Sequence, residues 1–443
     1  MTLVVEAPGA YEPERRYVLE VVLGDWLGLD WRLEVTERSN VRITADGDGD
    51  VVLPDVLFAT PPEAWLTPSC LPRRPLDRTA GVPVIYGAPD GGGQPVMDVL
   101  GSCFFMLTRL EERVVAARDA HGRFPADASV AHGEGFLDVP IVDVYVDLLW
   151  DALSGCWPRL ERRRREYRVA LTHDVDDPLA VLGRSRPELA RQLGADVLVR
   201  RDPALAARRI GSWLARSRGG RRLDPYNTFD FLMDVSERHG LASAFYFMAA
   251  DGRAGAEDPP YTLDDPWIEA LIARIHARGH EVGFHATDTD PERTIGSFER
   301  VRAAAGRVGV EQATWGGRQH YLRWENPSTW RTWETAGLDY DATLAYADRI
   351  GFRTGTCHEF AVFDLDERRA LRLRERPFQI MDRTLLEYMG LTPDAAHAAV
   401  REIAGECRRH EGVLCILWHN NAILGARQMR DYERLVAMAV SGR

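Results

Sequence analysis

Carboxylate and imidazole side chains follow directly after a short apolar run near the middle of the chain. Residues 169–171 are Val-Ala-Leu, and residues 172–178 read Thr-His-Asp-Val-Asp-Asp-Pro. A short apolar segment that ends in acidic residues predicts a buried parallel strand, which delivers its polar groups to the carboxyl edge of a sheet. In α/β enzymes this edge carries the chemistry. The sequence therefore predicts a catalytic centre at Asp174, Asp176 and Asp177.

Two later apolar segments also lead into a histidine. Residues 280–285 end at His285, and residues 413–418 precede His419. Because the carboxyl ends of parallel strands meet at one edge of a sheet, we expect Asp174, His285 and His419 to converge.

Predicted strands and helices alternate from residue 167 onward. Period-2 and period-3.6 patterns predict strands over 169–172, 242–248, 280–285 and 413–418, and helices over 228–239, 266–278, 298–307 and 329–336. This alternation predicts a parallel barrel or a wound sheet.

Residues 1–165 have a different pattern, which predicts a smaller α+β domain. Strands are expected over 17–23, 31–43 and 51–57, and helices over 98–118 and 139–153. The basic run 162–165 is the expected linker. A chain of 443 residues exceeds what one hydrophobic core usually organises, so we predict two domains, 1–165 and 166–443.

The composition excludes several classes of function. A net charge of -12 argues against nucleic acid as a partner. All 55 basic residues are arginine, which excludes lysine-dependent chemistry such as pyridoxal-phosphate catalysis. Six scattered cysteines without a metal-binding spacing fit reduced thiols. No apolar stretch has the length of a signal peptide core or a membrane span, so we expect a cytoplasmic protein.

Residues 184–222 form a basic insert. They contain eleven arginines, and their apolar residues recur at helical spacing, which predicts one or two amphipathic helices. Such helices can rest on an anionic membrane or hold a phosphorylated lipid carrier. The alternative is a solvated helical hairpin packed beside the barrel.

Four separated segments resemble the motifs of the polysaccharide deacetylases, the chitooligosaccharide-deacetylase-like carbohydrate esterases. Residues 172–176 (Thr-His-Asp-Val-Asp) are similar to the family's Thr-Phe-Asp-Asp-Gly, and residues 279–285 (Gly-His-Glu-Val-Gly-Phe-His) to its Gly-His-Glu-Ile-Gly-Asn-His. Residues 317–321 resemble its arginine motif, and residues 417–419 its closing Leu-x-His. The resemblance covers residues 167–425 and implies a distorted (β/α) barrel. Residues 1–165 resemble the amino-terminal domain of one bacterial branch.

The resemblance implies a hydrolase of carbon-nitrogen bonds other than peptide bonds, which removes an N-acyl group from an amino sugar with the help of a divalent metal, zinc or another. Carried over to this chain, Asp174 is the base and Asp176 a metal ligand, and Asp177 can exchange roles with Asp176. His419 is the general acid. Arg318 orients the base through a charge-assisted hydrogen bond.

The second motif departs from the family at one metal ligand. The family has a second histidine four positions after the first, and this chain has Thr289 there. A neutral hydroxyl is a poor third ligand for zinc. The expected metal set is then Asp176 and His285 with an oxygen of Asp288 or Asp290, and His320 can also reach inward.

Further residues are candidates for contacts with a carbohydrate substrate. They are Asp177, His320, Tyr321, Trp324, His358 and Asp382. Trp324 can stack on a sugar face, although tryptophans of this segment can equally belong to the core. Structural roles are the alternative for His358 and Asp382.

Three functions stay open at this stage. The first is a hydrolase with an Asp/His/Asp metal site, and the second is an altered enzyme without a metal. The third is a non-catalytic carbohydrate-binding or assembly protein that retains the barrel. The absence of a signal peptide and the basic insert favour a biosynthetic intermediate, a lipid-linked or nucleotide sugar, as the substrate.

Overall fold

A nine-stranded sheet organises the second part of the chain in the computed structural model. The structure describes residues 1–443 except 47, 90–94, 182–184, 215–219, 250–258 and 442–443. The strand order is β14-β15-β13-β12-β11-β10-β9-β17-β16, and every neighbouring pair is parallel except β14 and β15. The strands are β9 (Arg168–Val175), β10 (Ser243–Phe247), β11 (Glu281–Ala286), β12 (Gly316–Gln319), β13 (Tyr340–Asp341), β14 (Phe360–Asp364), β15 (Arg369–Glu375), β16 (Ile380–Met381) and β17 (Val413–Leu417).

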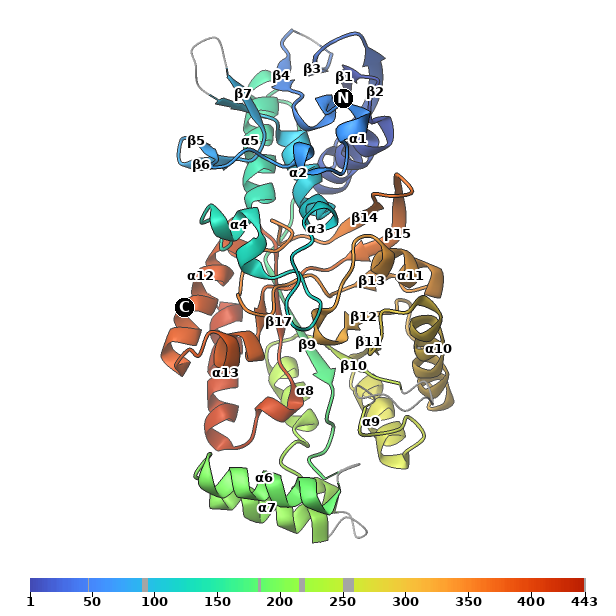
Figure 1. Cartoon of the computed structure of the whole chain (residues 1–443), viewed down its shortest axis with the longest axis vertical. Helices are drawn as coiled ribbons and strands as arrows, with labels where there is room; N and C mark the ends of the chain where they lie inside the picture. The colour runs from blue at the N-terminus through green and yellow to red at the C-terminus, as the bar shows by residue number, and fades with distance from the viewer. Residues whose placement is uncertain (47, 90–94, 182–184, 215–219, 250–258, 442–443) are drawn as a thin grey trace.

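Helices cover the flanks of this sheet. Figure 1 shows α9, α10 and α11 on one flank and α12 and α13 on the other. The helices are α8 (Phe229–Arg238), α9 (Pro266–Ala277), α10 (Pro291–Arg307), α11 (Ser328–Ala336), α12 (Pro393–Arg409) and α13 (Ala426–Ser441). All five residues of β10 are buried, as expected for a strand that is covered on both faces. The alternation of strands and helices predicted from residue 167 onward is therefore confirmed.

The prediction of a barrel is not met in the described residues. Hydrogen bonds do not join the edge strands β14 and β16, so the structure has one large, mostly parallel sheet without barrel closure. Both ends of this sheet consist of strands that the sequence pattern did not predict, β14, β15 and β13 at one end and β16 at the other. Strands β13 and β16 have only two residues each, too short to give a periodic signal, and β14 and β15 form an antiparallel pair at one edge.

Residues 1–165 hold a four-stranded sheet of order β2-β1-β3-β4 and a group of helices. The strands are β1 (Thr2–Pro8), β2 (Asp30–Thr36), β3 (Asn40–Thr44) and β4 (Val51–Pro54), with two small pairs, β5 (Asp77–Thr79) with β6 (Val82–Val84) and β7 (Gly87–Pro89) with β8 (Pro95–Met97). The helices are α1 (Glu12–Leu19), α2 (Val99–Leu107), α3 (Leu110–Val114), α4 (Val130–Gly133) and α5 (Ile141–Cys156).

The strand predicted over residues 17–23 is wrong. This segment belongs to α1 and to the π-helical segment Glu20–Trp26, and almost all its side chains are buried. Within residues 17–23 only Glu20 is exposed, so this short run is nearly all apolar and its pattern does not distinguish a helix from a strand. Pro13 in the first turn and acidic residues beside it are the helix-start signals that outweigh the β-branched residues.

The two parts of the chain share one hydrophobic core. A single cluster of buried side chains runs from Leu3 to Ala439. The division into domains 1–165 and 166–443 therefore stays a prediction.

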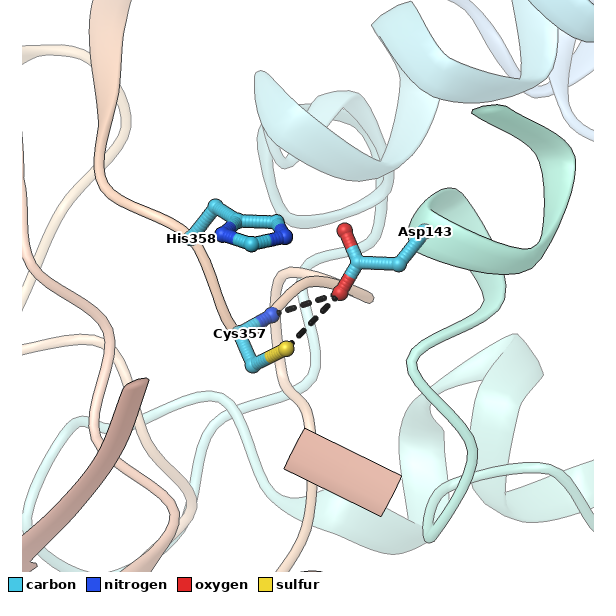
Figure 2. Close-up of side chains that lie close together, drawn as sticks. All are labelled: Asp143, Cys357 and His358. Atoms are coloured by element: carbon cyan, nitrogen blue, oxygen red, sulfur yellow. Dashed lines mark hydrogen bonds between the residues drawn. The ribbon is translucent and has the colours of Figure 1, made fainter. Parts of the chain in front are cut away.

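Asp143 of α5 ties residues 1–165 to the loop before β14. Its carboxylate accepts hydrogen bonds from the Thr356 hydroxyl at 2.6 Å, the Cys357 amide at 2.9 Å and the Cys357 thiol at 3.1 Å. His358 lies beside Asp143 and Cys357 (Figure 2). Aspartate, cysteine and histidine are residue types that bind metals in proteins. The carboxylate already has three donors and also faces the charge of Arg165. We therefore assign the group to packing between the two parts.

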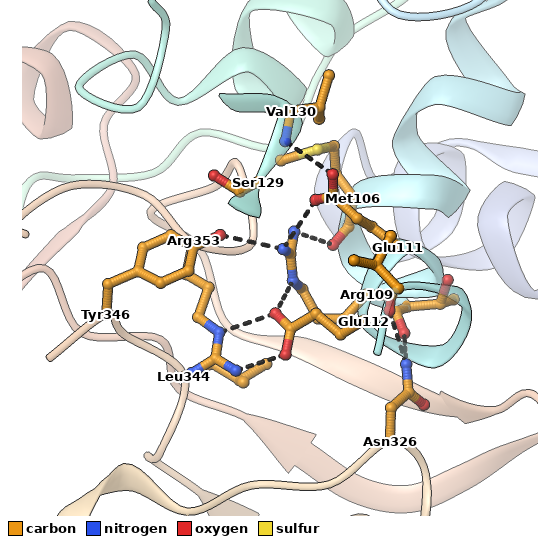
Figure 3. A network of polar contacts seen from close by, with 12 residues as sticks. Met106, Arg109, Glu111, Glu112, Ser129, Val130, Asn326, Leu344, Tyr346 and Arg353 are labelled. Atoms are coloured by element: carbon orange, nitrogen blue, oxygen red, sulfur yellow. Dashed lines mark hydrogen bonds and ion pairs between the residues drawn. The ribbon is translucent and has the colours of Figure 1, made fainter. Parts of the chain in front are cut away.

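A second junction is a buried ion network (Figure 3). The Glu112 carboxylate accepts from Arg109 Nε at 2.8 Å and from Arg353 Nε and Nη2 at 2.9 and 2.5 Å. All three side chains are at most 2% exposed. Burial alone raises the pKa of Glu112, but the charges of Arg353 and Arg109 outweigh it and the pKa is lowered. One carboxylate thus bridges guanidinium groups from both parts, and Arg109 also lies 3.6 Å from the Glu111 carboxylate.

The basic insert folds as a helical hairpin of α6 (Arg186–Leu198) and α7 (Pro203–Leu214). A capping box at Ser185 and Glu188 begins α6, and the buried pair Asp196–Arg209 joins the helices at 2.8 Å. Of the predicted insert 184–222, residues 184 and 215–219 lie outside the described residues. No helix of the described chain has the length and apolar character needed to cross a bilayer.

Replacing Glu112 by alanine tests the ion network. The change leaves the buried Arg353 without the Glu112 carboxylate and leaves Arg109 with Glu111 at 3.6 Å, so we expect the free energy of unfolding to fall by about 3–5 kcal/mol. Arg372→Ala is the control, because the Arg372 side chain is 91% exposed and its loss should change the free energy by less than about 0.5 kcal/mol. Urea denaturation measures both. Equal stability of the two variants would contradict the assignment.

Candidate functional site

Arg318 of β12 connects three strand ends at the carboxyl edge of the sheet. Its side chain is fully buried. The guanidinium donates to Asp174 Oδ1 at 2.7 Å, to Thr172 Oγ1 at 3.1 Å and to the carbonyl of Ala342 at 2.7 Å. Burial alone raises the pKa of Asp174, but the charges of Arg318, His285 and His419 together outweigh it and lower the pKa. Asp174 is therefore an ionised carboxylate held in one orientation.

Close strand packing brings Arg318 to this point. Gly317 pairs with Phe284 of β11, and a Cβ atom at Gly317 would lie 1.7 Å from the Phe284 carbonyl oxygen. Only glycine fits there. The same register sets His285 of β11 opposite Arg318.

His285 faces the acidic residues with one ring nitrogen. Its Nδ1–H donates to the carbonyl of Arg318 at 2.8 Å, so the neutral ring presents an unprotonated Nε2. That nitrogen lies 3.2 Å from Asp176 Oδ1 and 3.7 Å from Asp174 Oδ2. Burial alone lowers the pKa of His285, but the Asp174 and Asp176 charges outweigh it and raise the pKa. The position between Nε2 and Asp176 attracts a proton or a metal cation.

His320 completes a group of three metal-ligand types. One ligand atom each of Asp176, His285 and His320 lie within 4.8 Å of one another. Asp176 Oδ1 and His320 Nδ1 are buried without a hydrogen-bond partner. Burial lowers the pKa of His320 to about 4, which keeps its ring neutral. Two imidazoles and one carboxylate form a donor set for zinc or for non-haem iron.

His419 lies on the other side of Asp176, after β17. Its Nδ1–H donates to Asp382 Oδ1 at 2.7 Å, and its Nε2 is 3.6 Å from Asp176 Oδ2. Burial alone lowers the pKa of His419, but the charge and hydrogen bond of Asp382 outweigh it and raise the pKa to about 9. His419 therefore carries a proton at neutral pH and presents it toward Asp176.

Asp174, Asp176, His285, His320 and His419 line one cavity of about 460 Å³. Its size is that of a pocket for a small ligand. The residues around it are Arg123, Asp174, Asp176, Asp177, Met248, Pro259, Pro260, His285, His320, Tyr321, Leu322, Met381, Arg383, Glu387, Tyr388, His419 and Asn421.

Several residues proposed from the sequence lie elsewhere. Asp288 pairs with Arg293 at 2.8 Å and accepts from the Asp290 amide, so it belongs to the turn before α10. Asp290 caps that helix, and Thr289 is exposed. Trp324 is buried against Trp330 in the core.

Two further proposed substrate contacts also have other positions. His358 lies in the junction with Asp143, outside the cavity lining. Asp382 is fully buried and orients His419 from behind, so it does not line the cavity. Asp177, His320 and Tyr321 do line it.

Sequence reasoning missed five polar residues of the cavity. They are Arg123, Arg383, Glu387, Tyr388 and Asn421. Asn421 stands two positions after His419, and this closeness to a predicted catalytic residue could have indicated that it lines the cavity. Arg123 belongs to the part of the chain before residue 165, where no motif pointed to the site.

Comparisons with known proteins give a limited match. Residues 3–158 match DUF7033, a family of unknown function, over less than half of the chain. No curated protein matches. The similar solved structures include a polysaccharide deacetylase from Mycobacterium smegmatis, with 18% identity and a TM-score of 0.42, covering 62% of this chain and 85% of that one. A polysaccharide deacetylase from Pseudomonas aeruginosa has 12% identity and a TM-score of 0.39, covering 62% and 84%. Similarity at this level assigns no activity.

Proposed function

We propose that the chain is a metal-assisted hydrolase that removes an N-acyl group from an amino sugar. The observation that carries the proposal is that Asp174, Asp176, His285, His320 and His419 line one cavity, with Arg318 and Asp382 holding Asp174 and His419 from behind. The resemblance of the four sequence motifs to polysaccharide deacetylases supports the same reaction.

Asp176, His285 and His320 are the proposed metal ligands. Their chemistry fits, because two of their buried atoms have no hydrogen-bond partner and the ring of His320 stays neutral. This set replaces the expected Asp288 with His320. It also accounts for Thr289, because the imidazole missing after β11 is supplied after β12, the neighbouring strand.

The residues beside the ligands have complementary proton chemistry. A divalent cation held by Asp176, His285 and His320 would supply Lewis-acid chemistry, which would polarise the acyl oxygen and make a water molecule more acidic. Asp174, ionised and fixed by Arg318, accepts the proton of the attacking water. His419, protonated and held by Asp382, gives its proton to the departing amine. Base and acid thus stand on neighbouring strands, β9 and β17.

The identity of the third ligand gives the first test of this function. We expect His320→Ala to weaken binding of Zn²⁺ or Co²⁺ at least 100-fold, because it removes one of three donors. Thr289→Ala should leave affinity within about twofold, because Thr289 is exposed. Calorimetric titration of chelator-stripped protein measures both. Loss of affinity in Thr289→Ala and not in His320→Ala would overturn the proposed ligand set.

The reaction itself is tested by acetate release. The metal-loaded protein is assayed on free, oligomeric and nucleotide-linked N-acetylhexosamines. Asp174→Asn should lower kcat/KM about 10²–10⁴-fold, because the base is lost. The metal content of the same sample is the control. Binding of the sugars without release of acetate, unchanged in Asp174→Asn, would instead favour a carbohydrate-binding protein.

We further propose that the α6–α7 hairpin rests on an anionic lipid surface. Leu198 and Val199 at its tip are each 78% exposed, and Arg200 and Arg201 follow them directly. An exposed apolar tip beside arginines fits a bilayer interface with acidic headgroups. Figure 1 draws the hairpin beyond the carboxyl end of β9, and Arg208 bonds to the carbonyl of Leu424 after β17. A lipid-linked amino sugar would then meet the cavity at the membrane surface.

Vesicle sedimentation tests this contact. The double variant Leu198→Ser, Val199→Ser should bind vesicles containing phosphatidylglycerol at least tenfold more weakly, because two apolar side chains no longer enter the interface. Leu148→Ser is the control, since Leu148 is 43% exposed on α5. Wild-type protein that stays in solution with these vesicles would remove the membrane contact while leaving the proposed reaction intact.

A further inference from the structure

A loop from the first part of the chain reaches the candidate metal site. Residues 119–124 follow α3, and Arg123 of this loop lines the cavity. Asp119 holds the Arg123 guanidinium through Nε and Nη2, both at 2.7 Å, and also accepts from the Arg123 backbone amide at 2.9 Å. Arg123 is only 6% exposed. The loop therefore presents a fixed cation to the site.

Two side chains of this loop contact the same residue, Tyr321. Arg123 Nη1 donates to the Tyr321 carbonyl at 3.3 Å. The ring of His121 stacks on the Tyr321 ring, with centroids 5.3 Å apart and an angle of 15° between the planes. The Tyr321 ring in turn stacks on His320, with centroids 3.9 Å apart. A continuous stack thus joins His121 to the proposed third metal ligand.

The backbone of this segment needs support. Tyr321 and Leu322 have φ angles of 58° and 57°, in the left-handed region that non-glycine residues rarely adopt. Strained residues persist only where surrounding structure fixes them, and they gather at functional sites. The Arg123 hydrogen bond holds the carbonyl at this turn. The turn directly follows His320, and its Tyr321 ring stacks on the His320 ring, so a change in the turn would remove a contact that supports that ring.

We propose that His121 and Arg123 are positioning residues that hold His320 in place as a metal ligand. This inference rests on the proposed function, because it requires a metal at Asp176, His285 and His320. The part of the chain before residue 165 is then a component of the metal site. Residues that orient a ligand typically change metal affinity by 10- to 100-fold when they are lost.

A second contact of Arg123 agrees with this role. Its Nη2 lies 3.3 Å from the Tyr388 hydroxyl on another wall of the cavity, and the guanidinium carbon is 5.6 Å from that ring centre. One guanidinium therefore links the loop to the segments after β12 and after β16. Movement of the loop would disturb both walls together.

Cobalt titration of full-length, chelator-stripped protein tests the proposal. The probe is Co²⁺ alone, whose visible absorption reports both its affinity and the number of its ligands. We expect His121→Ala and Arg123→Gln each to weaken Co²⁺ binding about 10-fold or more, with a spectrum that shows the loss of a ligand. His121→Phe should restore near wild-type affinity, because it keeps a stacking ring without a nitrogen.

The matched control is Arg118→Gln in the same region, whose side chain bonds to the carbonyls of Val115, Ala117 and Glu112. It should bind Co²⁺ as the wild type does. Thermal melting of each metal-free variant separates misfolding from a local effect, and the less disruptive Arg123→Lys stands in if Arg123→Gln melts early. Wild-type affinity and spectrum in folded His121→Ala and Arg123→Gln would overturn this inference while leaving the proposed function intact. Absence of Co²⁺ binding in the wild type would overturn both.

Discussion

The buried guanidinium of Arg318 is the constraint on which the site depends. A fully buried charge is tolerated only with a partner and satisfied hydrogen bonds, and Arg318 obtains these from Asp174, Thr172 and the carbonyl of Ala342. The same residue fixes the tautomer of His285 through its own carbonyl. Strand β12 thus orients the proposed base with its side chain and one proposed metal ligand with its backbone. Displacement of this strand would disturb both together.

The first part of the chain is joined to this sheet by buried charges as well as by the shared core. Glu112 pairs with Arg353, and Asp143 accepts hydrogen bonds from the loop at Cys357. The Glu112 pair holds helix α3, and the loop that carries Arg123 to the cavity follows this helix. A hydrogen-bonded ion pair fixes the relative orientation of the two side chains, whereas apolar contacts are non-directional. Arg123 itself is then held by Asp119 within the loop and by Tyr321 and Tyr388 across the cavity.

The sequence allowed prediction of the alternating elements after residue 167, because strands buried on both faces and amphipathic helices carry strong periodic signals. It also placed Asp174, Asp176, His285 and His419 at strand ends, where the topology brings them together, whereas Arg318 was identified by the motif it resembles. It did not predict Arg123, because a contact between residues 123 and 321 depends on tertiary packing that no local pattern records. Asp288 was assigned to the metal by its spacing, yet a nearby arginine and the helix N-terminus at residue 290 satisfy it locally.

In the proposed metal site the third ligand, His320, follows β12 and not β11, and sheet geometry allows this change of position. Neighbouring parallel strands present their carboxyl ends about 5 Å apart, so a ligand lost after one strand can be supplied after the next without moving the others. His285 stands opposite Arg318, and His320 lies two residues beyond Arg318. The rings of His285 and His320 lie with their centroids 5.1 Å apart, and the left-handed residues Tyr321 and Leu322 follow His320 directly. The backbone directly after His320 is strained at Tyr321 and Leu322. The contacts of Tyr321 with His121 and Arg123 help to offset this strain.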